Sequence, residues 1–267
     1  MDDDMISGGA PLHRLLAIMA RLRDPATGCP WDIEQTFATI APYTVEEAHE
    51  VADAIDRQAW GELPGELGDL LLQVVYHAQI GTEQGRFSFD DIARGIGDKM
   101  VARHPHVFGD ESRDKSAAQL TADWERLKAA ERGPARTLDG IAMGLPALTR
   151  AVKLQKRAAR VGFDWPSTDQ VVAKIAEEAA ELVEARDRLT QAEVAEEMGD
   201  LMFVMANLAR HLKVDPEAAL RAANAKFTRR FGRIEDWLAE AGRTPGQSDL
   251  TEMDALWDRA KAEEKPR

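Results

Sequence analysis

Two sets of four carboxylates occur in this chain, and each reads E-x-x-E, fifteen intervening residues, then E-x-x-D. On an α-helix, positions i and i+3 share a face, so each motif places two carboxylates side by side. Such like-charge pairs destabilise a helix by roughly 0.2 to 0.5 kcal/mol, so four converging carboxylates indicate a cation site suited to Mg²⁺, with Mn²⁺ as the alternative. The eight candidate metal ligands are Glu47, Glu50, Glu66 and Asp69 in the first half, and Glu178, Glu181, Glu197 and Asp200 in the second, each 131 residues from its counterpart.

This repeat identifies the chain as an internal duplication. The segment Glu66-Leu67-Gly68-Asp69-Leu70 is echoed by Glu197-Met198-Gly199-Asp200-Leu201, and acids make up only 47 of the 267 residues, so a match of four positions in register is hard to obtain by chance. A chain of this length can form two domains of ordinary size. We therefore predict a first domain over residues 11–131, a linker over 132–144 and a second domain over 145–267.

A basic pair with helical i, i+4 spacing follows each carboxylate set, and a tryptophan follows each pair. The basic pairs lie 127 rather than 131 residues apart, which predicts a four-residue insertion in the turn at 81–88 of the first half. Carboxylates for a metal, bases for phosphate oxygens and an indole for a flat ring are the parts of a nucleoside polyphosphate site. These residues are Lys99, Arg103 and Trp124 in the first half, and Lys226, Arg230 and Trp257 in the second.

The elements that must position these side chains are helices. Apolar residues at three- and four-residue spacing predict helices over 12–23, 44–58, 64–79, 89–103 and 121–131. Few segments alternate with period two, so we expect an all-α fold of two tandem helical bundles. Thr44, Ser88 and Asp215 are the predicted helix caps, and Pro64 is a predicted first-turn proline.

Composition excludes several classes of protein. A net charge of −13 argues against a binder of nucleic acid polymers, whose affinity comes from basic residues that neutralise phosphates. No apolar run approaches the roughly 20 residues that span a bilayer, so we expect no membrane association. A single cysteine and an acidic start, Asp2-Asp3-Asp4, predict a cytoplasmic protein without a signal peptide. Cys29 is interpreted as a small, buried or half-buried residue before Pro30, not as a nucleophile.

Each motif taken alone also fits a solvated helix face, so the alternatives matter. Glu66 and Asp69 flank a broad apolar helix face, where carboxylates are costly unless they are paired or bound to metal. A di-iron site would need Glu-x-x-His on two helices, but His49 in the first half is replaced by Ala180 in the second. His104-Pro105-His106 is interpreted as a turn that ends a helix.

These residues resemble the MazG family of all-α nucleoside triphosphate pyrophosphohydrolases. The resemblance runs from about Leu12 to Lys261 and includes Gly28-Cys29-Pro30-Trp31-Asp32 and Val161-Gly162-Phe163-Asp164-Trp165. It implies a Mg²⁺-dependent homodimer that hydrolyses nucleoside triphosphates. We expect both nucleoside and deoxynucleoside triphosphates as substrates, with broad base tolerance, because the indole of Trp257 can stack on any base. Cleavage between the α and β phosphates would give a nucleoside monophosphate and pyrophosphate. The rival hypothesis is a non-catalytic nucleotide-sensing or helix-pairing regulatory protein, although a pure scaffold has no use for clustered like charge.

The resemblance also implies roles for individual residues. In the second half it assigns catalysis to Glu177, Glu178 and Glu181. Glu177, and Glu46 in the first half, could accept the proton of the attacking water. The alternative is that each is only an exposed glutamate in the first turn of its helix. Tyr43 stands where the second half has Lys174, which predicts that the second half dominates turnover. The residues that the resemblance assigns to nucleotide binding are Lys174, Glu193, Glu196, Asp200, Lys226, Arg230 and Trp257.

Overall fold

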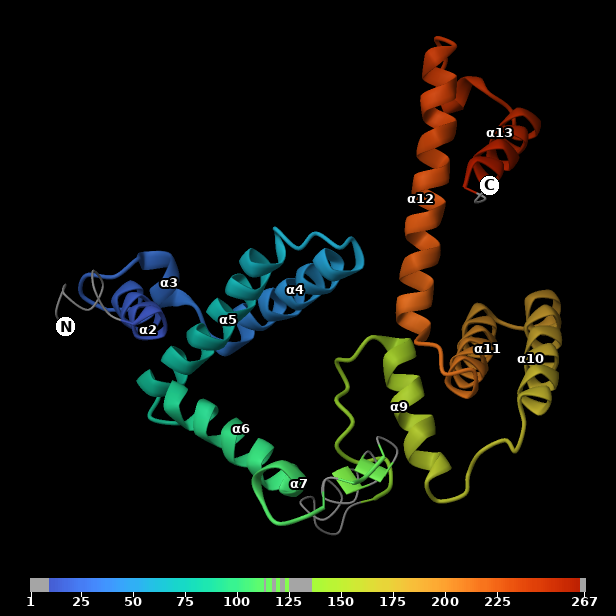
Figure 1. Cartoon of the computed structure of the whole chain (residues 1–267). Helices are drawn as coiled ribbons and strands as arrows, with labels where there is room; N and C mark the ends of the chain where they lie inside the picture. The colour runs from blue at the N-terminus through green and yellow to red at the C-terminus, as the bar shows by residue number, and fades with distance from the viewer. Residues whose placement is uncertain (1–9, 113, 117–118, 121–122, 125–135, 265–267) are drawn as a thin grey trace. The chain divides into compact units, whose positions relative to one another are not determined.

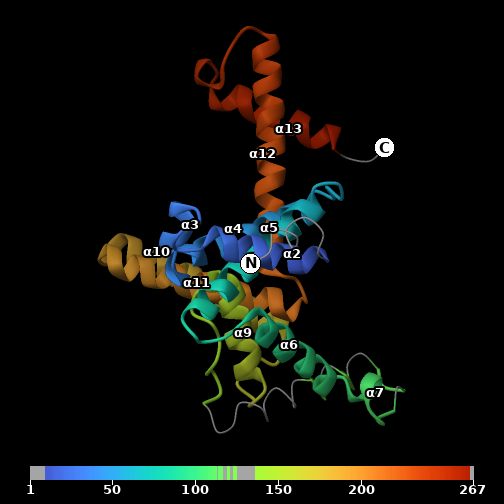
Figure 2. The ribbon, with the colours of Figure 1, turned by 90° about the vertical axis from the view of Figure 1, so that its left-hand side faces the viewer.

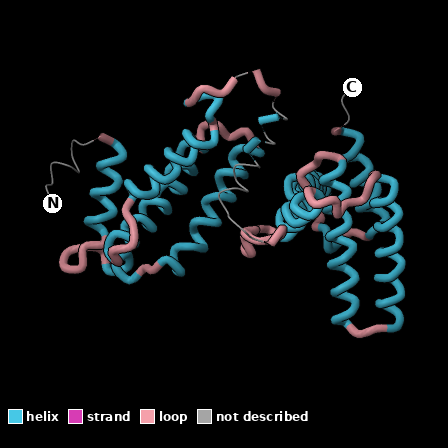
Figure 3. Tube along the Cα trace, turned by 90° about the horizontal axis from the view of Figure 1, so that it is seen from below, coloured by secondary structure: helices cyan, strands magenta, loops and turns pink. Residues whose placement is uncertain are grey.

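A computed structural model of the chain describes residues 10–112, 114–116, 119–120, 123–124 and 136–264. Every regular element in this part of the chain is a helix, which confirms the predicted all-α fold (Figure 3). The structure divides into two compact units, residues 1–131 and 132–267. Within the described ranges, no helix is long and apolar enough to cross a membrane.

The first unit is built around an antiparallel pair of long helices, α4 and α5 (Figure 1). Its core consists of Met19 of α2, Ile40 of α4, and Val75, Tyr76 and Ile80 of α5, each no more than 4% exposed. This cluster holds α2 against the α4–α5 pair. The helices of this unit are α2 (Pro11–Leu22), α3 (Pro30–Glu34), α4 (Phe37–Asp56), α5 (Leu63–Glu83), α6 (Phe89–Arg103) and α7 (Pro105–Phe108).

The second unit repeats this plan with an antiparallel pair, α10 and α11, and with α9 packed on α11. The long helix α12 leads away from α11, and α13 folds back on α12, where Ile234, Trp237 and Leu238 are buried (Figures 1 and 2). The elements of this unit are α9 (Ala147–Ala159), α10 (Thr168–Arg188), α11 (Gln191–His211), α12 (Pro216–Glu240), the 3-10 helix η1 (Pro245–Gln247) and α13 (Leu250–Glu263).

The start of α4 differs from the prediction. The helix begins at Phe37, because Thr36 and Thr39 cap it reciprocally: Thr39 N donates to Thr36 Oγ1 at 3.3 Å, and Thr36 N donates to Thr39 Oγ1 at 2.8 Å. The prediction that Thr44 caps this helix is therefore wrong, and its hydroxyl instead donates to the Ile40 carbonyl at 3.3 Å, inside the helix. Pro42 lies within α4, although a proline there removes one backbone donor.

The other predicted caps are confirmed, but the helix predicted over 64–79 continues to Glu83. Ser88 caps α6 by accepting from Asp91 N at 3.3 Å, and the Asp215 carboxylate caps α12 by accepting from the N–H groups of Glu217 and Ala218 at 2.9 and 3.1 Å. Pro64 lies in the first turn of α5. The four-residue insertion predicted at 81–88 is confirmed. From the E-x-x-D motif to the end of the helix, α5 is three residues longer than α11, and the loop before α6 is one residue longer than the loop before α12.

The region between the two halves is described only in part. Most of the predicted helix over 121–131, and residues 132–135 of the predicted linker, lie outside the described residues. Within the second unit, Nη1 of Arg157 on α9 donates to the carbonyls of Thr137 and Asp139 at 3.2 and 2.9 Å. The segment of the predicted linker around residues 137–139 is therefore held against α9.

Candidate metal and nucleotide site

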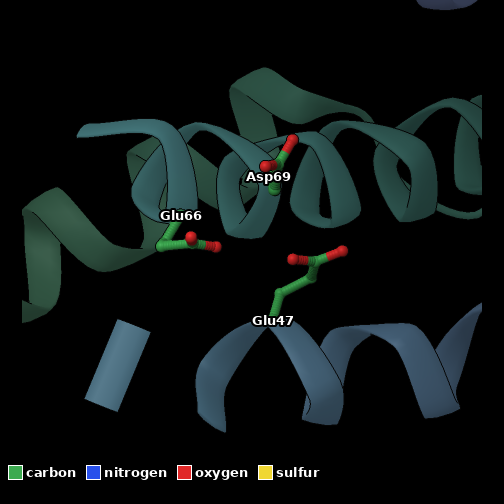
Figure 4. A group of neighbouring side chains, drawn as sticks. All are labelled: Glu47, Glu66 and Asp69. Atoms are coloured by element: carbon green, nitrogen blue, oxygen red, sulfur yellow. The ribbon is translucent and has the colours of Figure 1, made fainter. Parts of the chain in front are cut away.

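The first carboxylate set comes together from two neighbouring helices. Glu47 of α4 and Glu66 and Asp69 of α5 each offer an oxygen atom within 4.8 Å of the others. Figure 4 shows Glu47 and Glu66 directed into the space between the two helices, with Asp69 one turn further along α5. The amide of Gln73, which is buried, donates to Glu47 at 3.4 Å and so orients that carboxylate.

Electrostatics show that these carboxylates lack compensating charge. Partial desolvation, then the charges of Asp69 and Glu50, raise the pKa of Glu47. Desolvation, then the charges of Glu50 and Asp69, likewise raise the pKa of Glu66. Glu50 therefore belongs to the same electrostatic group as the other three. A divalent cation with oxygen ligands would relieve this repulsion.

The second set has the same construction. Glu178 of α10 and Glu197 and Asp200 of α11 each offer an oxygen within 4.8 Å of the others, and Glu178 is only 6% exposed. Desolvation, then the charges of Glu181, Glu178 and Asp200, raise the pKa of Glu197. Glu181 thus completes the second group as Glu50 completes the first.

Lys174 distinguishes the second set from the first. Its Nζ lies 2.7 Å from Glu177 Oε1 and 2.7 Å from Glu178 Oε1, and these two bonds raise the pKa of the lysine. In the first unit the corresponding residue is Tyr43, which is 43% exposed and carries no charge. The second set therefore has an internal cation that the first set lacks.

Two other residues predicted to bind nucleotide lie at the start of α11. Glu193 forms a reciprocal cap with Thr190: its Oε2 accepts from Thr190 N at 2.8 Å and from Thr190 Oγ1 at 2.7 Å. These hydrogen bonds lower the pKa of Glu193 and give it a structural role. Glu196 is exposed beside Glu197.

Lys226, Arg230 and Trp257 form a separate group on α12 and α13. The Arg230 guanidinium lies 5.5 Å from the centre of the Trp257 ring and pairs with Glu264 at 2.7 Å, while Trp257 packs against Phe227 at 5.3 Å between ring centres. Within the part of the chain that the structure describes, none of these contacts reaches a carboxylate of α10 or α11. Within the second unit, the described contacts therefore do not bring the predicted basic and aromatic group to the carboxylate set of α10 and α11.

The first unit contains a similar arginine–tryptophan arrangement. The Arg103 guanidinium lies 6.0 Å from the centre of the Trp124 ring, in the same order along the chain as Arg230 and Trp257. The duplication has thus kept the aromatic group as well as the carboxylates.

Sequence reasoning missed the residues that fix the Cys29-Pro30-Trp31-Asp32 segment. The buried Arg23 guanidinium pairs with Glu83 at 2.7 Å and donates to the carbonyls of Asp32 and Gln35. The Tyr76 hydroxyl donates to Asp32 Oδ1 at 2.8 Å. The available signal was Arg23 itself, a charged residue one turn after the buried Met19 on the apolar face of α2. Cys29 is half-buried and begins α3, in agreement with its predicted packing role.

Comparison with known proteins agrees with this geometry. Residues 35–108 match the model of the MazG nucleotide pyrophosphohydrolase domain, and residues 145–227 match that of phosphoribosyl-ATP pyrophosphohydrolase. The chain is 52% identical over 258 residues to a nucleoside triphosphate pyrophosphohydrolase of Escherichia coli, covering 95% of this chain and 98% of the relative. It is 41% identical over 259 residues to the nucleoside triphosphate pyrophosphohydrolase/pyrophosphatase MazG of Thermotoga maritima, covering 96% and 98%. A nucleoside triphosphate pyrophosphohydrolase of Mycobacterium tuberculosis is 38% identical over 157 residues, covering 58% and 47%.

Proposed function

Since the chain belongs to the MazG family of nucleoside triphosphate pyrophosphohydrolases, we propose that it hydrolyses nucleoside and deoxynucleoside triphosphates between the α and β phosphates. The products are a nucleoside monophosphate and pyrophosphate. One observation carries this proposal: each unit brings three carboxylates from two helices within 4.8 Å of one another, and a fourth contributes to the same electrostatic group.

The donor set supports Mg²⁺ as the metal ion. All the donors are hard carboxylate oxygens, and desolvation followed by the charges of neighbouring carboxylates raises the pKa of Glu47, Glu66 and Glu197, as expected for groups that need a counter-cation. Glu47, Glu50, Glu66 and Asp69 would hold one site, and Glu178, Glu181, Glu197 and Asp200 the other. When bound, Mg²⁺ neutralises phosphate charge and lowers the pKa of a coordinated water.

The protein's own residues then bind the phosphates and move the proton. Lys174 uses two of its three N–H donors on Glu177 and Glu178, so the third is available to a phosphate oxygen. The Glu177 side chain is 58% exposed beside the carboxylate set, where it can accept the proton of the attacking water. Because Tyr43 offers no such ammonium group, we propose that the second unit supplies most of the turnover.

A homodimer is part of the proposal. Met198, Met202 and Met205 form a stripe at i, i+4 and i+7 of α11, and they are 45%, 43% and 55% exposed. At the 131-residue offset, Leu67 and Leu71 of α5 are 48% and 39% exposed. Apolar stripes of this kind are typical of surfaces that a second helix pair covers.

Within the second unit, the described contacts of this group do not reach the carboxylate set, so we propose that assembly of two chains brings Lys226, Arg230 and Trp257 to a carboxylate set. A tryptophan face stacks on any base, which favours broad base tolerance.

A second candidate substrate follows from the match of residues 145–227 to phosphoribosyl-ATP pyrophosphohydrolase. This activity also releases pyrophosphate from a triphosphate, so the same carboxylates would serve it. The test is to incubate the full chain and Mg²⁺ separately with each nucleoside triphosphate, each deoxynucleoside triphosphate and phosphoribosyl-ATP, and to separate the products by ion chromatography.

We expect pyrophosphate and a monophosphate, and their formation should stop when EDTA is added and resume with excess Mg²⁺. A diphosphate plus orthophosphate would refute cleavage at the α–β bond. Nucleotide binding without any product would favour the sensing protein over the enzyme. The Glu47→Gln/Glu178→Gln double variant is the control for contaminating phosphatases.

A further inference from the structure

The second unit contains a basic pocket of about 530 Å³ on a chain whose net charge is −13. It lies between α9 and the junction of α11 and α12. Its charged lining consists of Lys153 and Lys156 of α9, Arg210 and Lys213 at the end of α11, and Asp215. A concave surface with several cations raises the local concentration of anions against the field of the whole protein.

The three lysines of the basic pocket are not paired with neighbouring acids, whereas its arginine is. Among the described residues, Lys153, Lys156 and Lys213 form no ion pair. Arg210 pairs with Asp164 behind the pocket and donates to Asn207 at 3.3 Å, but its Nε is buried without a hydrogen-bond partner.

The acids in and beside the pocket, in contrast, are engaged with backbone groups. The Asp215 carboxylate, which lines the pocket, accepts from the first N–H groups of α12, and the nearby Glu217, which does not line it, accepts from Thr149 N at 3.4 Å.

The duplication supplies an internal comparison. The first unit has a cavity of about 520 Å³ in the corresponding place, between α2, the end of α5 and the cap of α6, and no lysine or arginine lines it. At the 131-residue offset, Gln79 and Thr82 stand where the second unit has Arg210 and Lys213. The fold therefore does not need these cations for packing, and the charge is a property of the second unit alone.

The basic pocket is distinct from the carboxylate set. Arg210 follows Asp200 by ten residues on the same helix, a separation of about 15 Å at the rise of an α-helix. An anion in this pocket would therefore lie away from the reacting phosphate.

We propose that the basic pocket is a second anion site, which binds the phosphate chain of a polyphosphate. Lysines act as mobile point charges and suit a phosphate chain without fixed geometry. The anion would be either free pyrophosphate or the phosphate chain of a nucleotide, for which the pocket has room.

The test measures binding to the full chain by isothermal titration calorimetry in EDTA, where the carboxylate sets hold no metal and repel polyanions. One arm uses pyrophosphate and the other uses α,β-methylene-ATP. We expect saturable binding at one site per chain in at least one arm, weakened at least tenfold in Lys153→Gln/Lys213→Gln. Both lysines are exposed, so the variant should melt at the wild-type temperature.

The control Arg94→Gln/Arg188→Gln removes the same charge from exposed positions elsewhere and should bind like wild type. No binding in either arm, unchanged binding in the lysine variant, or equal loss in the control would overturn the proposal. Tighter binding of pyrophosphate would identify a product site, and tighter binding of the analogue would identify a nucleotide site.

Discussion

Replacing Glu178 by glutamine separates the proposed catalytic role of the second carboxylate set from its role in stability. Glutamine keeps the shape of the side chain but removes a charge that lies within 4.8 Å of Glu197 and Asp200 and 2.7 Å from Lys174. Loss of the hydrogen bond to Lys174 destabilises the fold. Relief of the repulsion from Glu197 and Asp200 stabilises it, and solvent screens both effects.

Because these effects oppose each other, Glu178→Gln should change the free energy of unfolding by no more than about 2 kcal/mol and leave the melting temperature within a few degrees of wild type. Turnover should fall much further. Loss of a metal ligand typically costs orders of magnitude in rate, and we expect at least a 100-fold decrease, which corresponds to about 2.7 kcal/mol.

The assay is pyrophosphate release at saturating Mg²⁺, combined with thermal melting of the same preparations. Glu47→Gln is the matched variant of the first unit, and it should retain more activity than Glu178→Gln because Tyr43 replaces Lys174 there. If Glu178→Gln keeps half of the wild-type turnover, the carboxylate set is not the catalytic site. If Glu47→Gln is the more damaging variant, the proposed dominance of the second unit is wrong.

Three further predictions follow from single contacts. Trp257→Ala should raise KM for all substrates by a similar factor, about tenfold for each 1.4 kcal/mol of lost stacking, with kcat less affected. A loss of several degrees in Tm, with equal damage to kcat and KM, would show that Trp257 only packs against Phe227. Arg23→Met should lower the free energy of unfolding in urea by about 3 kcal/mol, because it removes the ion pair with Glu83. Burial raises the pKa of Glu83, but hydrogen bonds from Arg23 and Gln79 lower it overall, so the difference in stability from wild type should be full at neutral pH and shrink as the pH falls below about 4. A difference that stays constant with pH would exclude this ion pair as its source. Met202→Glu should shift the chain from dimer to monomer in light scattering, and an unchanged mass would place the interface elsewhere.

The acidic helix pairs were readable from the sequence because the signal was both periodic and repeated. Apolar spacing gave the helices, and the offset of 131 residues set the two carboxylate sets in register. Glycine- and proline-containing turns, together with caps such as Ser88 and Asp215, then gave most of the helix ends.

The start of α4 and the placement of the basic group were not readable. Thr36 and Thr39 extend α4 backwards through a reciprocal cap, and the extended helix tolerates Pro42, which reads as a helix boundary in isolation. The direction in which α12 leaves α11 is set by the short turn before Asp215 and by packing with α9. The order of Asp200 and Lys226 along the sequence contains no information about the direction in which α12 leaves α11.

The single substitution of tyrosine for lysine between the two units also changes how they compete for a scarce ion. With Glu46 and Glu177 included, five carboxylates surround each site, but Lys174 offsets one charge in the second unit only. We therefore expect the first unit to bind a divalent cation more tightly than the second and to fill first as the free Mg²⁺ concentration rises. A calorimetric Mg²⁺ titration should show two phases, with turnover following the weaker one; a single phase that coincides with turnover would contradict this order. Turnover would then follow the affinity of the second unit for Mg²⁺, and the first unit would already hold its ion when the second begins to work.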